Sequence, residues 1–307
     1  MTHTKLLYCA KRRGRIVLFC VQKECGDCLP FREGVIRLTF TYGDLMEKRP
    51  DYANWISTKG LMIFGVAGLF AILLLILTFT FGGGGILIAI RCVLALCAAI
   101  LLIFFAYLIH ARRLLDYNGG GIQGRVLDNL LANLDWNGKG RLLDIGCGSG
   151  ALAIKAARKF PEAQITGIDY WGAIWDYALE QCEDNAKLEG VADRTNFQKG
   201  DAAGLDFPDA TFDAVVSNLV FHEVRSQPDK LALIREALRV LKPNGVFALE
   251  DIFFSKGVYG DIGKIVQTLS GDVSSITFVD TRECDFFPVT LKTPLVLGNV
   301  GLIKGRK

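Results

Sequence analysis

The hydrophobic residues of this 307-residue chain fall into two long runs followed by a series of shorter ones. Residues 61–81 contain no charge, residues 86–109 contain only Arg91, and four glycines at 82–85 separate the two runs. A helix of about 20 apolar residues is long enough to cross the hydrocarbon core of a bilayer. The pattern therefore predicts a transmembrane helical hairpin with a very short external turn.

The charges around the two runs indicate an orientation. Lys48, Arg49 and Lys59 precede the first run and Arg112 and Arg113 follow the second, whereas the turn between the runs is uncharged. Loops rich in Lys and Arg stay on the cytoplasmic side of a membrane. The sequence therefore predicts a multi-pass protein of the cell membrane, with both termini and everything after the hairpin in the cytoplasm.

Three further residues fit this arrangement. Trp55 and Tyr107 fall at the expected near-side interface, and Arg91 lies close enough to the turn for its side chain to reach the far interface. A hairpin buried in a soluble core is the alternative, although such long apolar runs are rare there. A signal peptide is not expected, because the run starts late and no small-residue cleavage site stands out.

After residue 120, short apolar runs alternate with amphipathic stretches, which is typical of an α/β fold. Helices are expected from about Gly121, only about ten residues after the second run, and over 151–160. The first of these buries one face made of Ile122, Val126, Leu127, Leu130, Leu131 and Leu134. Strands are expected at 142–145, 164–169, 195–199, within 207–218 and, after a turn at 241–245, at 246–250. Further apolar runs are expected to form closing strands at 276–279, 295–297 and 300–303.

Composition sharpens this division of the chain. Hydrophobic residues make up 51% of it, and the mean hydropathy is +0.31, with the excess in the two long runs. Residues 1–60 hold 11 Lys/Arg and 6 Asp/Glu, whereas residues 112–307 hold 23 Lys/Arg and 26 Asp/Glu. A mildly acidic C-terminal part offers no electrostatic footprint for nucleic acid, so no such partner is expected. The 9 scattered cysteines, an odd number, argue against a disulfide framework and fit a reducing cytoplasm.

The segment 142–150, Leu-Leu-Asp-Ile-Gly-Cys-Gly-Ser-Gly, carries the strongest chemical signal. An apolar strand ends near an acid, Asp144, and a glycine loop then leads into a helix, which is where α/β folds hold nucleotide-like cofactors. A dinucleotide-binding loop has a different glycine spacing and no such acid, which disfavours a nicotinamide dehydrogenase. The segment resembles the first motif of the class I S-adenosylmethionine (SAM)-dependent methyltransferases.

The resemblance extends over about 119–307, because the later pieces follow in the family's order. It implies a Rossmann-like, seven-stranded, mostly parallel sheet with helices on both faces. In this family the acid at Asp144 binds near the amino group of SAM, and an acid at Asp201 meets the adenine amine. Asp169, about 20 residues after the glycine loop, is suited to accept hydrogen bonds from both ribose hydroxyls. The resemblance implies a cofactor site made of Asp144, Gly146, Cys147, Gly148, Ser149, Gly150, Asp169, Tyr170, Asp201, Ala202 and Asn218.

Two assignments inside this site stay open. Tyr170, Trp171 or Trp175 is a candidate to stack on adenine, and packing in a helix core suits Trp175 equally well. Cys147 lies at a helix N-terminus, a place that lowers a thiol pKa. Members of the family often carry a cysteine there without catalytic use, so we interpret Cys147 as a packing residue.

The exit of the fourth strand supplies the candidate for catalysis. His222 is the only histidine after the hairpin, and its ordinary pKa near neutrality suits a general base. The alternative is a histidine that only hydrogen-bonds to the chain or covers the cofactor. Glu223 either orients His222 or is a solvated acid at a helix start, and Asn218 is placed to contact the cofactor or the acceptor.

The acceptor is expected to be small. The chain lacks the Asn/Asp-Pro-Pro-Tyr/Phe motif of amino-group methylation, and 200–213 resembles the small-molecule branch, which includes quinone-ring methyltransferases. A short tether to the hairpin points to an apolar or amphiphilic acceptor, with a plain anchor and a water-soluble acceptor as the alternative. Two other functions remain open: modification of protein or nucleic acid at the membrane, and SAM sensing or scaffolding without turnover.

The first residues resemble nothing else in the chain. We expect residues 1–60 to form a poorly ordered extension, 61–110 the hairpin and 111–307 the methyltransferase domain. Met46 is a candidate natural start, since a compact polar lead into the membrane run begins there. The cysteines of this segment are irregularly spaced, so no metal site is expected from them or from Asp206, Asp209 and Asp213.

Overall fold

A computed structural model describes residues 5–12, 15–21, 38–40, 49–118, 121–171 and 178–307. The chain forms two compact units, Met1–Arg49 and Pro50–Lys307. In the first unit β1 (Lys5–Arg12), β2 (Arg15–Val21) and β3 (Leu38–Phe40) pair antiparallel in that order. The rest of the proposed extension up to residue 48, including Cys25, Cys28 and Met46, lies outside the described residues.

The second unit begins with the expected helical hairpin, α1 (Thr58–Leu77) and α2 (Gly85–Leu115). A short 3-10 turn, η1 (Thr78–Thr80), ends the first arm. Arg91 donates from its guanidinium to the carbonyl oxygens of Thr78 (2.8 Å) and Phe81 (3.2 Å), so it closes the turn between the helices. The arms pack closely, with the rings of Phe64 and Phe104 4.8 Å apart.

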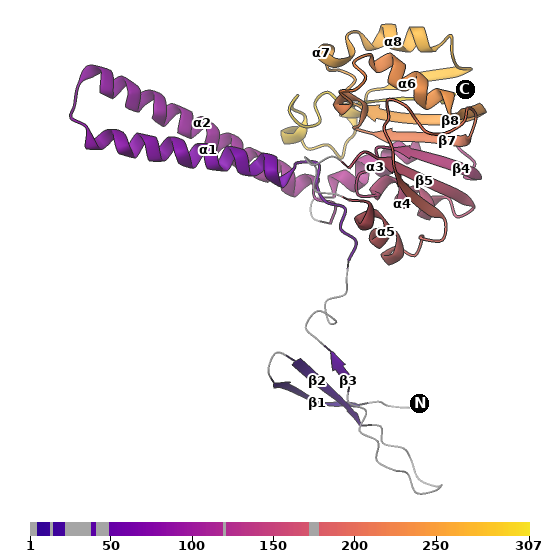
Figure 1. Ribbon diagram of the computed structural model, residues 1–307, viewed down its shortest axis with the longest axis horizontal. Helices are drawn as coiled ribbons and strands as arrows, with labels where there is room; N and C mark the ends of the chain where they lie inside the picture. Colours follow the sequence, from indigo (N-terminus) through magenta and orange to yellow (C-terminus); the bar gives the residue numbers. More distant parts are fainter. Residues whose placement is uncertain (1–4, 13–14, 22–37, 41–48, 119–120, 172–177) are drawn as a thin grey trace, which may run out of the picture. The chain divides into compact units, whose positions relative to one another are not determined.

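Helix α2 is longer than the apolar run that predicts it. It continues past residue 109 to Leu115, so the expected ten-residue tether is mostly helix. Ala111 and Leu115 are buried there, in a cluster with Ile122 and Val126 of α3 (Ile122–Ala132). Burial of this last stretch explains the continuation, since the helix gains packing against the following domain. Figure 1 shows α2 running up to α3.

A seven-stranded sheet forms the core of the rest, in the spatial order β6-β5-β4-β7-β8-β10-β9 (Figure 1). Strands β4 to β8 run parallel, and β10 is antiparallel to both β8 and β9, as expected for a mostly parallel sheet. The strands are β4 (Gly140–Ile145), β5 (Ala163–Asp169), β6 (Thr195–Lys199), β7 (Phe212–Asn218), β8 (Leu241–Asp251), β9 (Ser275–Val279) and β10 (Gly301–Arg306).

Helices cover both faces, again as expected. Buried residues of α3, α4 (Ala151–Lys159) and α5 (Leu179–Leu188) share one core cluster, with the residues of β4, β7 and β8 that point to that face. Residues of α6 (Lys230–Arg239) and α8 (Ile262–Leu269) share the other, and the short α7 (Lys256–Tyr259) joins it through Tyr259. This alternation follows from the period of two along each strand, which sends successive side chains to opposite faces.

Two expected details differ. Strand β8 begins at Leu241, so the turn expected before it belongs to an irregular start of the strand. Residues 295–297 form no strand: they lie in a turn between Pro294 and Gly298, and the Gly298 N–H donates to the Thr293 carbonyl (2.7 Å). Proline removes a ladder donor and the glycine permits a close turn, which breaks an apolar run that resembles a strand.

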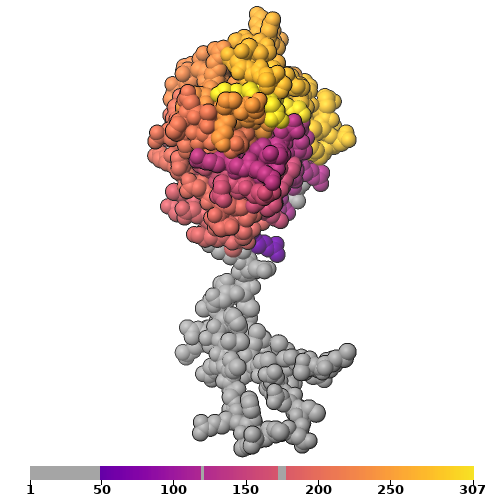
Figure 2. Space-filling model, turned by 90° about the vertical axis from the view of Figure 1, so that its right-hand side faces the viewer, coloured from indigo at the N-terminus to yellow at the C-terminus, as the bar shows by residue number. Residues whose placement is uncertain are grey.

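The last strand also fastens the start of the domain. Lys304 donates to the side chain of Asn133 (2.8 Å), and Arg306 to that of Asp135 (3.2 Å). Figure 2 shows these chain-terminal residues, in yellow, beside the magenta segment that follows α3. The C-terminal strand therefore holds the segment that links the hairpin to the sheet.

Leu130 of α3 is fully buried in the core cluster between this helix and the sheet. Leu130→Ala is expected to lower the free energy of unfolding by about 2–5 kcal/mol, because it leaves a cavity in a close-packed core. Urea unfolding of detergent-solubilised protein, followed by near-ultraviolet circular dichroism, measures this. Leu188→Ala, at an exposed position on α5, is the control and should stay within about 0.5 kcal/mol. Equal effects would contradict the packing described for α3.

Candidate active site

A cavity of about 910 Å³ opens at the carboxyl ends of β4, β5 and β7. Strands β5 and β6 lie on one side of β4, whereas β7 and β8 lie on the other, so this is the switch point of the sheet. Ligands of open α/β sheets bind at such points. The cavity brings together all the site residues expected from the sequence except Gly150: Asp144, Gly146, Cys147, Gly148, Ser149, Asp169, Tyr170, Asp201, Ala202, Asn218 and His222.

The glycine loop takes the backbone shape that its sequence allows. Gly146 has φ +73°, and a Cβ there would lie 2.2 Å from a methyl group of Val220. Gly150 has φ +82° and stands at the N-cap of α4, with the ring of Phe197 beneath it. Both positions need glycine, Gly146 to let the chain approach the cavity and Gly150 to turn into the helix.

Asp144 is an acceptor without a donor. It is 1% exposed, and among the described residues neither carboxylate oxygen has a hydrogen-bond partner. Burial raises its pKa to about 8, the nearby backbone N–H of Ala153 partly opposes the rise, and the charge of Asp169 adds to it. Buried polar groups are nearly always satisfied, so an orphaned carboxyl that lines a cavity suits a cationic or donor group of a ligand.

Asp169, at the end of β5, is held by the backbone. One carboxylate oxygen accepts from the Gly148 N–H (2.9 Å) and the other from the Trp171 N–H (2.7 Å). An ionised carboxylate offers about four lone-pair sites, so each oxygen can still accept one more hydrogen bond. The backbone thus orients Asp169 without using up its capacity toward a ligand.

The aromatic residues after β5 differ in their placement. The indole N–H of Trp171 donates to the Gly148 carbonyl (2.8 Å), so this ring braces the glycine loop. Tyr170 is 63% exposed and lines the cavity, with the Lys199 ammonium 5.0 Å from its ring centre. Trp175 lies outside the described residues. Tyr170 therefore remains the aromatic residue placed to cover a ligand.

Two other predicted residues have simpler surroundings. Burial raises the pKa of the Cys147 thiol well above its usual range, and the neighbouring Cys182 adds to this, which agrees with a packing residue. Asp201 is exposed at the cavity, and one of its oxygens accepts from the Ala203 N–H (2.9 Å). Within the described ranges, no group of three or more His, Cys, Asp or Glu residues is arranged to hold a metal ion.

A segment ahead of the hairpin also lines the cavity, which the sequence did not indicate. The Ser149 hydroxyl donates to the Tyr52 carbonyl (2.8 Å). The Asn185 side chain accepts from the Asp51 N–H (2.8 Å) and donates to the Ser149 carbonyl (3.0 Å). Trp55, expected at a membrane interface, also lines the cavity. These contacts hold residues 51–55 against the glycine loop, where Tyr52 and Trp55 line the cavity.

His222 is oriented by an acid that the sequence analysis missed. Its Nδ1 lies 2.6 Å from a carboxylate oxygen of Asp251, at the end of β8, whereas Nε2 is 3.8 Å from Glu223. Asp251 is 1% exposed, and its second oxygen accepts from the His222 backbone N–H (3.2 Å). Although desolvation opposes it, the hydrogen bond and charge of Asp251 raise the pKa of His222 above 6.5. A carboxylate on Nδ1 leaves Nε2 as the nitrogen able to accept a proton.

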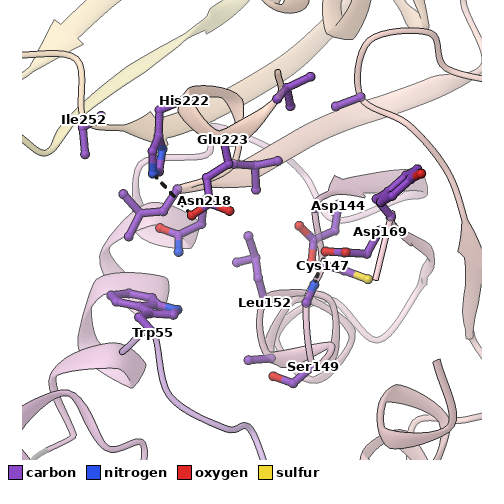
Figure 3. A pocket seen from close by; sticks show the side chains of 18 of the residues that line it. Trp55, Asp144, Cys147, Ser149, Leu152, Asp169, Asn218, His222, Glu223 and Ile252 are labelled. Carbon is purple, nitrogen blue, oxygen red and sulfur yellow. Dashed lines mark hydrogen bonds and ion pairs between the residues drawn. The ribbon is translucent and has the colours of Figure 1, made fainter. Parts of the chain in front are cut away.

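The cavity has a polar and an apolar region. Figure 3 shows Asp144, Cys147 and Asp169 gathered on one side, with His222 and Ile252 on another. The side-chain oxygens of Gln123 and Asn218, both lining residues, are buried without a partner in the part of the chain described here. Gln123 was overlooked because it interrupts the apolar face of α3. The apolar lining includes Trp55, Ile56, Leu115, Leu152, Leu219, Ile252, Leu295, Val296 and Leu297.

Comparison with known proteins agrees with this geometry. Residues 143–249 match the family described as methyltransferase domain, so this part of the chain is a methyltransferase domain. A 27-O-demethylrifamycin SV methyltransferase of Amycolatopsis mediterranei is 35% identical over 156 residues, 50% of this chain and 54% of that protein. A sterol 24-C-methyltransferase of Aspergillus fumigatus is 36% identical over 109 residues, 36% of this chain and 27% of that protein. The chain spans about half the length, or less, of these curated relatives.

Solved structures also resemble part of the chain. The [4+2]-cyclase SpnF aligns at 23% identity and a TM-score of 0.45, over 60% of this chain and 80% of its own. A phosphoethanolamine N-methyltransferase 2 of Haemonchus contortus, solved with S-adenosyl-L-methionine, aligns at 21% identity and a TM-score of 0.42. That alignment covers 52% of this chain and 39% of the other.

The contact between His222 and Asp251 predicts a measurable titration. Asp251→Asn should lower the pKa of His222, because the variant loses the charge that stabilises the imidazolium. NMR titration of the His222 ring signals, assigned by comparison with His222→Gln, measures this. An unchanged pKa would contradict the pairing.

The same contact predicts how stability depends on pH. A histidine whose folded pKa is raised contributes stability that is fully present below its unfolded pKa of about 6.5. This contribution is lost as pH rises through the folded value. The difference in thermal stability between the parent and Asp251→Asn should therefore shrink from pH 6 toward pH 9.

Proposed function

We propose that this chain is a membrane-anchored, SAM-dependent methyltransferase that modifies a small apolar or amphiphilic acceptor on the cytoplasmic side. The observation that carries the proposal is the orphaned, buried carboxyl of Asp144 beside Asp169. It shares one cavity with the His222–Asp251 pair and an apolar lining. The methyltransferase domain sets the class of reaction, and the surroundings of the cavity suggest the class of acceptor.

The acceptor groups of the cavity match the donors of the cofactor. SAM carries an ammonium group, two ribose hydroxyls and an exocyclic amine. Asp144 would take the ammonium side, Asp169 the ribose and Asp201 the adenine amine, while Gly146 and Gly148 let the backbone approach closely. When bound, SAM supplies a methyl group activated by its sulfonium.

The remaining task of the protein is to position the acceptor and to remove its proton. Methyl transfer needs donor and acceptor held in line and water excluded. His222 Nε2 would take the proton that the acceptor loses, and Asp251 would hold the ring and stabilise the imidazolium. This arrangement favours an acceptor with an ionisable hydrogen, such as a hydroxyl group on an apolar skeleton.

The hairpin supports the membrane part of the proposal. Its candidate spans cover Thr58–Thr80 and Gly85–Leu115, and only 11% and 6% of their most apolar windows are buried. A core helix of a soluble protein would be largely covered, whereas here apolar side chains such as Ile63 (66%) and Ile103 (71%) are exposed. The basic residues at both near ends, Lys59 and Arg113 among them, support a cytoplasmic active site.

Substitutions at three residues separate binding from turnover. Asp144→Ala and Asp169→Ala should each weaken SAM binding at least about tenfold, because each removes a carboxyl group that would accept from a donor of SAM. His222→Ala should leave the Kd for SAM within about twofold but lower turnover by about 10²-fold or more. Calorimetry with detergent-purified protein gives the Kd, and radiolabelled SAM with host lipid extracts gives turnover.

The matched control is Asp206→Ala, an exposed acid of the same domain that does not line the cavity. It should change neither quantity. SAM binding without methylated product in any fraction would favour a SAM-binding sensor or scaffold. Full turnover by His222→Ala would remove the base from the proposal.

The buried acid predicts a proton linked to binding. Since the pKa of Asp144 is raised to about 8, this carboxyl is mostly protonated at pH 7. A cation placed beside it should lower that pKa and release a proton on SAM binding. Titration calorimetry at pH 7 in phosphate and in Tris, whose ionisation enthalpies differ, measures the number released. Asp144→Asn should release none, and equal heats in both buffers for the parent would contradict the contact.

A further inference from the structure

We propose that the loop 288–299 is a membrane-embedded gate through which the acceptor passes from the bilayer into the cavity. The inference rests on the proposed function and goes beyond it by assigning the entry route and the residues that form it. It is carried by one loop that exposes Val289 and Leu295 and that lines the cavity with residues 295–297.

The loop holds the most exposed large apolar side chains outside the hairpin. Among the described residues of that part, four large hydrophobic side chains are exposed, and the two highest values belong to Val289 (83%) and Leu295 (72%). Scattered exposed apolar residues are ordinary on soluble surfaces. Here two lie on a single short loop that contacts the exposed apolar helix α2, with Lys292 also exposed between them.

Hydrogen bonds fix this loop to the end of the proposed membrane span. The Tyr107 hydroxyl donates to the Thr290 carbonyl (3.0 Å) and lies 2.7 Å from the Thr293 hydroxyl. His110 Nε2 lies 3.4 Å from the Thr290 hydroxyl. Tyrosine is typical of membrane interfaces, and Ile103, one turn earlier on α2, is 71% exposed. These contacts hold the loop at the depth where the apolar run of α2 ends.

Buried residues within the loop hold its exposed residues in place. Leu291 and Leu297 are fully or almost fully buried, in the same cluster as Ala111 and Leu115 of α2. The Leu297 N–H donates to the Leu291 carbonyl (3.0 Å), which closes the loop on itself. The buried pair thus anchors the loop, while Val289 and Leu295 stay on the outside.

The same loop reaches the active site. Leu295, Val296 and Leu297 line the cavity together with Ile56 and Leu115, which stand at the two near ends of the hairpin. An apolar acceptor dissolved in the bilayer would therefore meet Leu295 before it meets the catalytic pair. Because the loop contacts the hairpin, we take lipid of the bilayer to cover its exposed residues. A protein partner could cover them only if this surface lay outside the membrane.

The test measures the depth of the loop without any need for the acceptor. Val289→Trp, which lies outside the cavity lining, is compared with Leu188→Trp on α5, at the opposite end of the sheet. Each variant is placed in nanodiscs of phosphatidylcholine with or without brominated chains, and the fluorescence of the parent protein is subtracted. Bromine quenches only indole groups that reach the acyl region.

We expect the added signal of Val289→Trp to be quenched at least about twofold more than that of Leu188→Trp, as for a side chain about 5–10 Å below the headgroups. Equal quenching of both would overturn the gate. Photolabelling of the parent protein with a carbene-generating phosphatidylcholine gives an answer free of substitutions. Labels on the hairpin and on 289–297 but not on 179–188 support the proposal, and labels on the hairpin alone overturn it.

Calorimetry on the same nanodiscs separates this inference from the proposed function. A loop that reaches the lipid in a protein that does not bind SAM would contradict the methyltransferase proposal and leave the membrane contact standing. SAM binding with an unlabelled, unquenched loop would contradict the gate alone.

Discussion

Burial of the last turns of α2 is the constraint on which the rest of this protein depends. Ala111 and Leu115 belong to an otherwise exposed apolar helix, yet they pack into a cluster with α3 and with the loop that contains Leu291 and Leu297. One helix is therefore both an arm of the hairpin and an element of the domain core. Because α3 also covers the sheet, the hairpin, the cavity and the loop 288–299 share a single packed support.

The chemistry of the cavity depends on where the strands end. Parallel strands bring Asp144, Asp169 and Asn218 to one edge of the sheet, and β8 adds Asp251 at the same edge. Burial then gives these acids different properties: Asp144 is kept mostly protonated, while Asp251 is paired with a histidine whose pKa rises. Similar carboxyl groups thus suit two tasks, ligand recognition and orientation of a base.

Local pattern was enough to predict most of the sheet. Apolar runs and the glycine loop identified β4 to β7 and α3 within a few residues, because periodicity and glycine spacing act over short stretches. The pairing of His222 with Asp251 spans 29 positions and could not be seen in either segment alone. That Trp55 lines the cavity could not be predicted, because an aromatic residue beside an apolar run has the same signature at a membrane interface and over a cavity. Residues 295–297 have the composition of a strand, and only the neighbouring Pro294 and Gly298 indicate a turn.

The length of α2 has a consequence for how the proposed enzyme would meet its substrate. A helix of 31 residues is about 46 Å long, whereas the hydrocarbon core measures about 30 Å. The surplus is taken up inside the folded domain, where Ala111 and Leu115 near the end of the helix are buried by packing. The buried helix end would limit movement between the hairpin and the catalytic domain. In a bilayer, this junction would keep the cavity at a fixed distance from the membrane surface. Enzyme and acceptor would then meet by lateral diffusion in two dimensions.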